Sequence, residues 1–375
     1  MSAPTRVWDV MSEWQWFLQF EQEALRCGDR DRSRLLQIHD QGFAYRETNP
    51  DQTLALFREG QQLAERLEEP WWVMLFQQWQ VHATIYYKRD FRNLLDQAIH
   101  NLLTVQKPAH LAYPQRLHAY TDLIVIYLRI DPLGYCFEIR SALDELEREL
   151  SHETPDSHYM WNECRIDLAF AQEDYARVAE LTIAALGEAD SDPDQHAARH
   201  YMIAMHENMC LLEYHRRNWE GLERWAVALE SSGRYKGYQY PIALAQMWQA
   251  LLAEKQGQQT IGSRQQRTAL GRNKQLEWPA CPGYYHAWCH YHMLRGEFDE
   301  ALEVRERQFE KNVDKGQLAY ECDILIDKCR LLDLIGRLDD ENVEAAHRAA
   351  QRLRKPEFYI GKIEAITAGR ETLEL

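Results

Sequence analysis

Histidine and cysteine gather between residues 281 and 292, where the sequence is CPGYYHAWCHYH. His286 and His290 stand four residues apart, so a helix would bring both imidazoles to one face, with Cys281 and Cys289 nearby. A zinc ion needs four converging ligands. In the helical register Cys289 faces a neighbouring helix while the two histidines face the opposite side. We therefore predict neither a metal site nor a cofactor at this segment.

Two carboxylates, Glu163 and Asp167, also share one helical face at a spacing of four residues. Such a pair could act as general acid and base, but it is more often an acidic patch in a binding groove. The phosphate-binding loop, the serine nucleophile elbow, the His-Glu-x-x-His zinc motif and the dinucleotide-binding glycine motif are all absent from the sequence. A non-enzymatic protein is the favoured hypothesis, and an enzyme that uses Glu163 with Asp167 or the His286 cluster stays open.

Charge and hydropathy narrow the class of partner and the compartment. The chain has 59 acidic and 43 basic residues, a formal charge of −16, which argues against a nucleic-acid partner. No segment approaches the roughly 20 apolar residues that cross a bilayer, so we expect no membrane partner. Asp9 and Glu13 stand where a secretory signal would be basic, and eight cysteines in 375 residues suit a reducing compartment. These features predict a cytoplasmic protein.

Two amphipathic segments flank residues 296–301, GEFDEA, which we predict to form a tight turn. These segments would be the helices that position the histidines and cysteines. Cys289 and Ala301 are small enough to let two helices approach closely, and Tyr285, Trp288 and Phe298 would fill the space toward the next pair. One helical hairpin cannot bury its apolar face alone. The segment therefore predicts further hairpins on either side.

The turn recurs along the chain with nearly constant spacing. The large residue that follows each turn is separated from the next by 42, 42, 44, 40, 39 and 40 residues, in the series Phe91, Leu133, Tyr175, Trp219, Gln259, Phe298 and Leu338. Asp51 marks a first hairpin 40 residues before Phe91. The predicted helix pairs are 31–47 with 51–68, 71–88 with 91–106, 112–130 with 135–151, 156–172 with 175–187, 194–216 with 219–232, 240–256 with 260–277, 283–295 with 299–313, and 317–335 with 340–354. Prolines fall at the starts or turns of these pairs and never in a predicted interior.

The pattern resembles that of tetratricopeptide repeat (TPR) proteins, in a variant with hairpins of about 40 residues. The resemblance rests on Gly296-x-Phe298-x-x-Ala301, Gly336-x-Leu338, Asp174-Tyr175-x-x-Val178 and Asn218-Trp219-x-x-Leu222. Residues 50–70, PDQTLALFREGQQLAERLEEP, are also similar to second helices of bacterial signalling relatives. The third and sixth hairpins depart from the pattern, because Leu133 follows a proline and Gln259 replaces an aromatic residue. We expect a bend or different packing at both.

The resemblance implies an all-α fold, a right-handed superhelix of about eight hairpins over residues 30–355. A capping or docking helix would occupy residues 1–29, and a capping helix and tail residues 356–375. It also implies that a partner segment lies on the concave surface formed by the first helix of each hairpin. The residues expected on that surface are Trp79, Tyr86, His118, Arg129, Glu163, Asp167, Glu207, Tyr214, His286, His290, Asp323 and Arg330.

These residues alternate between aromatic and acidic character, which indicates a protein or peptide partner with basic and apolar side chains. We expect a scaffold or regulatory subunit, an adaptor or inhibitor of an effector protein. The alternative is a sensor of a peptide or small ligand, whose superhelix would tighten on binding. Solution scattering separates the two, since the radius of gyration of a sensor would change with ligand.

The predicted helix at residues 7–27 is apolar on two sides. One stripe contains Val7, Val10, Met11, Trp14, Phe17, Leu18 and Leu25, and the other contains Trp16, Phe20 and Ala24. A helix with two apolar faces is usually buried on both. It would cap the first hairpin, or alternatively dock a partner or a second copy of the chain.

Overall fold

The computed structural model describes residues 13–46, 48–150, 155–191, 195–276 and 282–370, and all regular structure in these ranges is helical. Each predicted hairpin appears as two helices. They are α2 (Arg30–Tyr45) with α3 (Pro50–Arg66), α4 (Pro70–Ala83) with α5 (Leu94–Val105), α6 (Arg116–Ile130) with α7 (Cys136–Leu150), α8 (Pro155–Ala171) with α9 (Tyr175–Ser191), α10 (Gln195–His215) with α11 (Trp219–Lys236), α12 (Gln239–Lys255) with α13 (Gln259–Leu276), α14 (Pro282–Leu294) with α15 (Phe298–Asn312), and α16 (Leu318–Leu334) with α17 (Asp340–Ala350). They are preceded by α1 (Glu13–Cys27) and followed by α18 (Pro356–Thr367).

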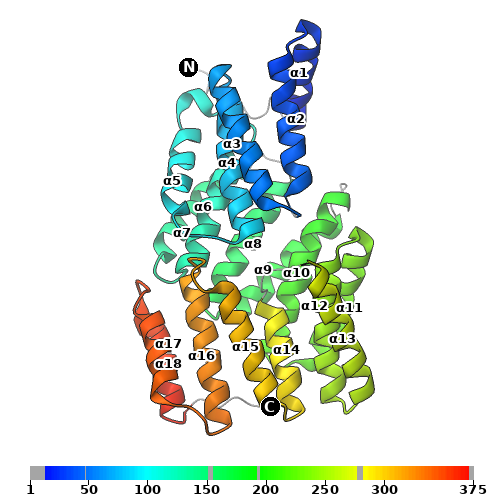
Figure 1. Cartoon of the computed structure of the whole chain (residues 1–375), viewed down its shortest axis with the longest axis vertical. Helices are drawn as coiled ribbons and strands as arrows, with labels where there is room; N and C mark the ends of the chain where they lie inside the picture. The colour runs from blue at the N-terminus through cyan, green and yellow to red at the C-terminus, as the bar shows by residue number, and fades with distance from the viewer. Residues whose placement is uncertain (1–12, 47, 151–154, 192–194, 277–281, 371–375) are drawn as a thin grey trace. The chain divides into compact units, whose positions relative to one another are not determined.

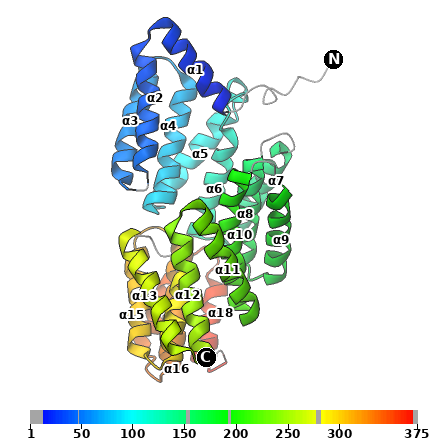
Figure 2. The same cartoon turned by 90° about the vertical axis from the view of Figure 1, so that its right-hand side faces the viewer.

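The chain forms two compact units. Unit 1 comprises residues 1–129 and 137–164, and unit 2 comprises residues 130–136 and 165–375. In unit 1, α2 packs on α3 and α3 on α4 (Figure 2). In unit 2, α10 to α13 pack in order, α14 packs on α12 and α15, and α16 packs on α15 and α17 (Figure 1). Stacking of sequence neighbours in this way is the packing of an α-solenoid. The all-α hairpin fold is therefore confirmed, and the right-handed superhelix stays a prediction.

A repeated backbone joint explains the regular spacing. Helices α9, α11, α13 and α15 begin at the predicted turn residues. Two residues before each of these starts, and two before Leu338, the backbone adopts a left-handed conformation, with φ between 56° and 74° at Glu173, Arg217, Gly257, Gly296 and Gly336. In the joint before α15, the Gly296 N–H donates to Met293 O (3.0 Å) and the Glu297 N–H donates to His292 O (2.9 Å). These bonds satisfy carbonyls that the helix end leaves without partners.

The two hairpins expected to depart from the pattern behave differently. In the sixth hairpin the Gly257 N–H donates to Glu254 O (2.9 Å), so its joint matches that of its neighbours despite Gln259. In the third hairpin, Asp131, the residue two positions before Leu133, does not have a left-handed backbone. Asp131 organises this turn instead, since its carboxylate accepts from the backbone N–H of Gly134 (2.8 Å) and of Arg354 (2.6 Å). The expected departure is thus confined to the third joint.

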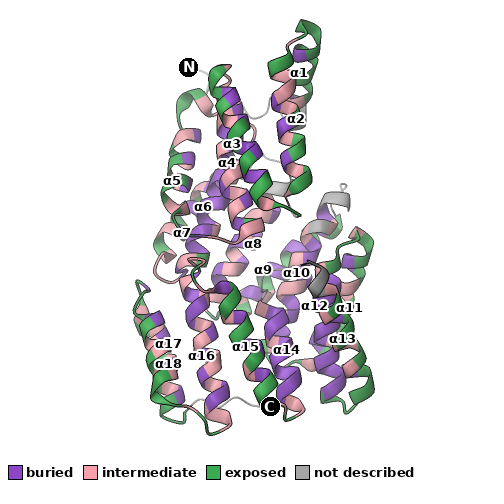
Figure 3. Cartoon of the chain, viewed as in Figure 1, coloured by how far each residue is buried: buried purple, intermediate pink, exposed green. Residues whose placement is uncertain are grey.

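Small buried residues allow the close approach of paired helices, as the sequence predicted. Cys210, Cys289 and Cys329 are each at most 1% exposed. The Cys289 Sγ lies 3.7 Å from the Ala301 carbonyl oxygen of the next helix, and Tyr285 and Trp288 belong to the surrounding core. Figure 3 shows the consequence, since α12 and α14 are buried along most of their length while α17 and α18 keep exposed outer faces. Burial follows the position of a helix in the stack.

Helix α1 buries one of its two predicted stripes. Trp16 and Phe20 are 7% and 6% exposed and meet the Trp72 ring at centroid distances of 5.2 and 5.0 Å. Leu18 and Leu25, on the other stripe, are 49% and 70% exposed. The helix therefore packs on α2 of the first hairpin and, through these rings, on α4 of the second. Val7, Val10, Met11 and the Trp14 side chain lie outside the described residues, so self-association stays a prediction.

Helix α4 continues beyond Ala83 as a π-helical turn, η2 (Thr84–Lys88), where the sequence predicted one uninterrupted helix to residue 88. The turn ends at Arg89, whose backbone is left-handed with φ of 49°. Segments of π-helix inside α-helices are often found at functional sites. This one carries Tyr86.

Candidate binding surfaces on the first helices

A row of aromatic and imidazole rings follows one face of α4 and η2. The Trp79 and His82 ring centroids are 4.5 Å apart, and those of His82 and Tyr86 are 4.3 Å apart. The Trp79 Nε1–H donates to Gln115 Oε1 (3.1 Å), which fixes the indole. We call this set, completed by His118, Asp122, Arg129 and Glu163 from the following helices, the unit 1 row.

The carboxylates of the unit 1 row lie against these rings. Asp122 Oδ1 is 3.2 Å from His82 Nδ1, and Asp122 Oδ2 is buried with no hydrogen-bond partner among the described residues. Burial, aided by the neighbouring His82, lowers the pKa of His118 to about 4. His118 is therefore neutral at physiological pH and adds no positive charge beside Asp122.

Tyr86 stands at the open end of this row. It is 39% exposed, yet surrounding protein and then the charges of Asp122 and Glu163 raise its pKa well above the ordinary value, with Arg129 opposing them. A side chain can be open to water and still crowded by protein where the surface is concave. Of the twelve predicted surface residues, Trp79, Tyr86, His118, Arg129 and Glu163 are thus brought together in unit 1.

A second row lies in unit 2, where four rings from α9, α10 and α14 follow one another. Tyr175 stacks on His215 with ring centroids 5.3 Å apart, His215 is 5.9 Å from His286, and His286 is 5.8 Å from Tyr214. His215 is exposed to solvent, but dense protein around it lowers its pKa to about 4. We call these rings, together with Asp323, Asp327 and Arg330 of α16, the unit 2 row.

A buried guanidinium organises the base of the unit 2 row. The Arg305 side chain is 7% exposed, and its NH2 group donates to His286 Nδ1 (3.1 Å) and lies 3.3 Å from Asp327 Oδ2. Arg330 donates from the other side to Asp327 Oδ1 (2.8 Å). Burial opposes ionisation of Asp327, but the charge of Arg305 outweighs it and holds the pKa of that carboxyl well below its usual range. Burial also lowers the pKa of His286 to about 3. The neutral ring accepts at Nδ1 and therefore carries its proton on Nε2.

The pKa of Asp323, one helical turn before Asp327, is shifted in the opposite direction. Burial raises its pKa to about 6, although the positive charge of Lys362 works against the increase. Lys362 itself donates to Glu173 Oε1 (2.6 Å), so it is shared between two carboxylates. Two aspartates four residues apart thus have pKa values on opposite sides of the ordinary one, because only Asp327 is contacted by arginines from two helices.

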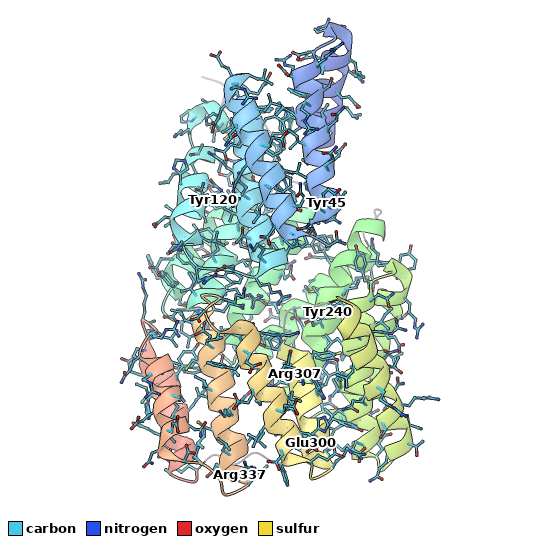
Figure 4. All side chains as sticks on the ribbon, viewed as in Figure 1. Tyr45, Tyr120, Tyr240, Glu300, Arg307 and Arg337 are labelled. Carbon is cyan, nitrogen blue, oxygen red and sulfur yellow. The ribbon has the colours of Figure 1, made fainter. Side chains whose placement is uncertain are left out.

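One predicted surface residue of unit 2 is placed otherwise than expected, and two others lie outside the unit 2 row. His290 is only 3% exposed and lies between Tyr214 and Trp219, with ring centroids 5.8 and 5.9 Å away. Its assignment to an open surface was wrong, because α14 is enclosed by α10, α12 and α15. Glu207 accepts from the Tyr240 hydroxyl (2.8 Å; Tyr240 is labelled in Figure 4). Asp167 is half-buried on α8. Only Tyr214, His286, Asp323 and Arg330 join the unit 2 row.

Several members of the rows escaped the sequence analysis, namely His82, Asp122, Tyr175, His215, Arg305 and Asp327. The most informative of these is Arg305. It falls between Val304 and Gln308 in the stripe that starts at Ala301, and all four are buried. A charged residue at a core position of a second helix predicts a buried ion pair, since a buried charge must be paired. The sequence could therefore have indicated Arg305.

The structure gives no metal centre among the described residues, where no three potential ligands come close enough to hold an ion. Cys281 and the side chains of His196 and His200 lie outside the described part of the chain. Within that part, the helices are also too short or too polar to cross a bilayer. No protein-family model matches the sequence, and no curated protein is significantly similar to it.

Proposed function

We propose that this chain is a cytoplasmic, non-enzymatic TPR-like scaffold or regulatory subunit that holds a partner protein segment on the rows of its first helices. The observation that carries the proposal is the convergence of side chains from separate hairpins. In unit 2, α10, α14 and α16 all contribute to one row, as do α4, α6 and α8 in unit 1. A preformed surface of this kind orders a partner without refolding the scaffold.

The unit 1 row supports a partner with basic and apolar side chains. Asp122 has a buried oxygen without a hydrogen-bond partner among the described residues, and Glu163 adds a second carboxylate close to Tyr86. A lysine or arginine side chain placed here would meet an aromatic face and a carboxylate together. Tyr86, at 39% exposure, would be the first ring that it reaches.

The unit 2 row supports a different kind of contact. Arg305 and Arg330 already neutralise Asp327, so the acidic character expected there is largely absent. What remains open is the stacked pair of Tyr175 and His215. These rings suit an apolar or aromatic side chain of a segment bound to unit 2.

A random dodecapeptide library displayed on phage tests the proposal, followed by fluorescence anisotropy of the enriched peptides. We expect the peptides to combine lysine or arginine with apolar residues. Peptides enriched on the unit 1 row should bind about tenfold or more weakly after Tyr86→Ala, and those enriched on the unit 2 row after His215→Ala, because both side chains are surface anchors. Both residues are exposed, so the fold should tolerate the changes.

Matched controls lie on second helices of the same units. Phe137 on α7 is 82% exposed in unit 1, and Tyr235 on α11 is 61% exposed in unit 2. Alanine at either position should leave peptide binding unchanged. The proposal fails if no peptide is enriched, or if the control variants weaken binding as much as Tyr86→Ala and His215→Ala do.

A further inference from the structure

A separate hollow of about 510 Å³ lies in unit 2 among α15, α16 and the region of α17. Phe309, Val313 and Leu325 form an apolar part of its lining. The charged residues of the lining are Glu306, Glu321, Lys328, Glu341, Arg348 and Arg352. None of these residues belongs to the unit 2 row. The volume is within the range of about 300–1,000 Å³ that is usual for small-molecule sites.

The three cations of the lining are already paired with carboxylates. Lys328 Nζ is 2.5 Å from Glu306 Oε1, and Arg348 NH1 is 3.3 Å from Glu344 Oε2. Arg352 NH1 donates to Glu321 Oε2 (2.7 Å). Glu341, in contrast, has no ion pair within the described ranges and is exposed. The lining thus carries three carboxylates and three cations, and Glu341 is its carboxylate without an ion pair among the described residues.

Glu321 adds a buried acceptor oxygen, Oε1, to the lining. Its side chain is 2% exposed, and its Oε1 atom has no hydrogen-bond partner in the part of the chain that the structure describes. Burial raises the pKa of Glu321, and the Arg352 guanidinium, which is bound to the other oxygen, Oε2, only partly opposes it. Leaving such an oxygen unpaired is costly, so a ligand that donates to it would gain binding energy.

We propose that this hollow binds an organic cation, an ammonium or guanidinium group on an apolar body, with the charged end at Glu321 Oε1. The apolar body would lie on Phe309, Val313 and Leu325. Arg352, whose side chain is 49% exposed, is an intramolecular competitor for the same carboxylate. The cation displaces part of the Arg352 interaction and supplies the missing donor. This site is independent of the rows on the first helices.

Calorimetric titration of the full chain at neutral pH with 4-phenylbutylamine tests the proposal. The matched probes are 4-phenylbutanol, which lacks the charge, and 4-phenylbutyrate, which reverses it. We expect measurable binding of the amine alone, mapped to α15–α17 by hydrogen exchange. A capped Leu-Lys-Leu tripeptide distinguishes the source of the cation, since it binds only where the hollow accepts a side chain of another protein.

Three variants complete the design. Glu321→Gln keeps the shape of the side chain and should weaken amine binding about tenfold or more, because a charge-assisted bond is lost. Arg352→Ala removes the competitor and should tighten amine binding several-fold. This variant still tests the proposal if Glu321→Gln does not fold. Glu300→Gln, an exposed carboxylate of α15 away from the hollow (Figure 4), should change nothing. Equal binding of alcohol and amine, or an Arg352→Ala variant that binds no more tightly, would overturn the proposal.

Discussion

Asp327 lies between two arginines of unit 2, and its replacement by asparagine keeps the shape of the side chain but removes the charge. Arg305 would then stay buried, at 7% exposure, without the carboxylate 3.3 Å away. Breaking a buried ion pair by removing one partner costs about 3–5 kcal/mol. Because the Asp327 side chain is 18% exposed and partly hydrated, we expect the lower end of this range, about 3 kcal/mol.

The effect should depend on pH in a defined direction. The pKa of Asp327 is lower in the folded chain than in the unfolded chain. Its stabilising contribution is therefore complete above the unfolded pKa of about 3.9 and is lost as the pH falls through the folded value. The difference between the wild type and Asp327→Asn should be full at pH 7 and should shrink only below about pH 4.

Urea unfolding followed by circular dichroism measures the loss, and hydrogen exchange in α14 to α16 locates it. Asp323→Asn is the matched control, since it changes the same residue type one turn away. The pKa of Asp323 is raised to about 6, so its charge opposes folding above that pH. Removing the charge should stabilise the chain by about 1–3 kcal/mol at pH 7 and have little effect at pH 4. The reasoning is refuted if Asp327→Asn costs less than about 1 kcal/mol, or if both variants shift stability in the same direction at pH 7.

Other predictions concern acid stability and packing. Burial lowers the pKa values of several histidines below the ordinary 6.5, among them His118, His206, His286 and His290. Their contribution to the free energy of unfolding is therefore complete above pH 6.5 and should fall toward pH 4, by up to about 1.4 kcal/mol per pH unit for each residue. A urea midpoint that is constant from pH 7 to pH 5 would contradict this. Trp16→Ala should lower the free energy of unfolding by about 3 kcal/mol, because it opens a cavity beside Trp72. Leu18→Ala, at a side chain that is 49% exposed, should change it by no more than about 0.5 kcal/mol. Equal losses for the two variants in thermal unfolding would exclude the capping role of α1. Gly60→Ala should destabilise by about 1–3 kcal/mol, since the new Cβ would approach the Phe76 ring to 2.4 Å. Gly187 lies in α9, and a Cβ added there would have no neighbouring atom within 4 Å. Gly187→Ala should therefore stabilise the folded chain by about 0.5–1 kcal/mol in the same assay.

The fold was predictable because each hairpin repeats a local signal. Turn residues such as Trp219 and Phe298 follow a reversal of the chain and start an amphipathic helix, and neither property depends on distant parts of the molecule. The π-helical turn at residues 84–88 was missed because its hydrogen bonds shift by one residue without any change in the apolar pattern.

The candidate surfaces were only partly predictable. Register alone identifies the face of a helix, and Tyr86 and His286, which it selected, lie in the two rows. It fails for His290, whose burial depends on how many helices enclose α14. It also fails for Arg305, which reaches the unit 2 row from a second helix. Contacts across hairpins depend on the rotation of one helix against another, and a periodic pattern does not encode that angle.

The left-handed joint before α9, α11, α13 and α15 has a consequence for engineering. Glycine occupies it at Gly257 and Gly296, but Glu173 and Arg217 hold the same conformation with a side chain present. Residues other than glycine are strained there by about 1–2 kcal/mol. Glycine at residue 217 or 173 would therefore relieve this strain without altering chain length, although at residue 173 it would also remove the bond from Lys362.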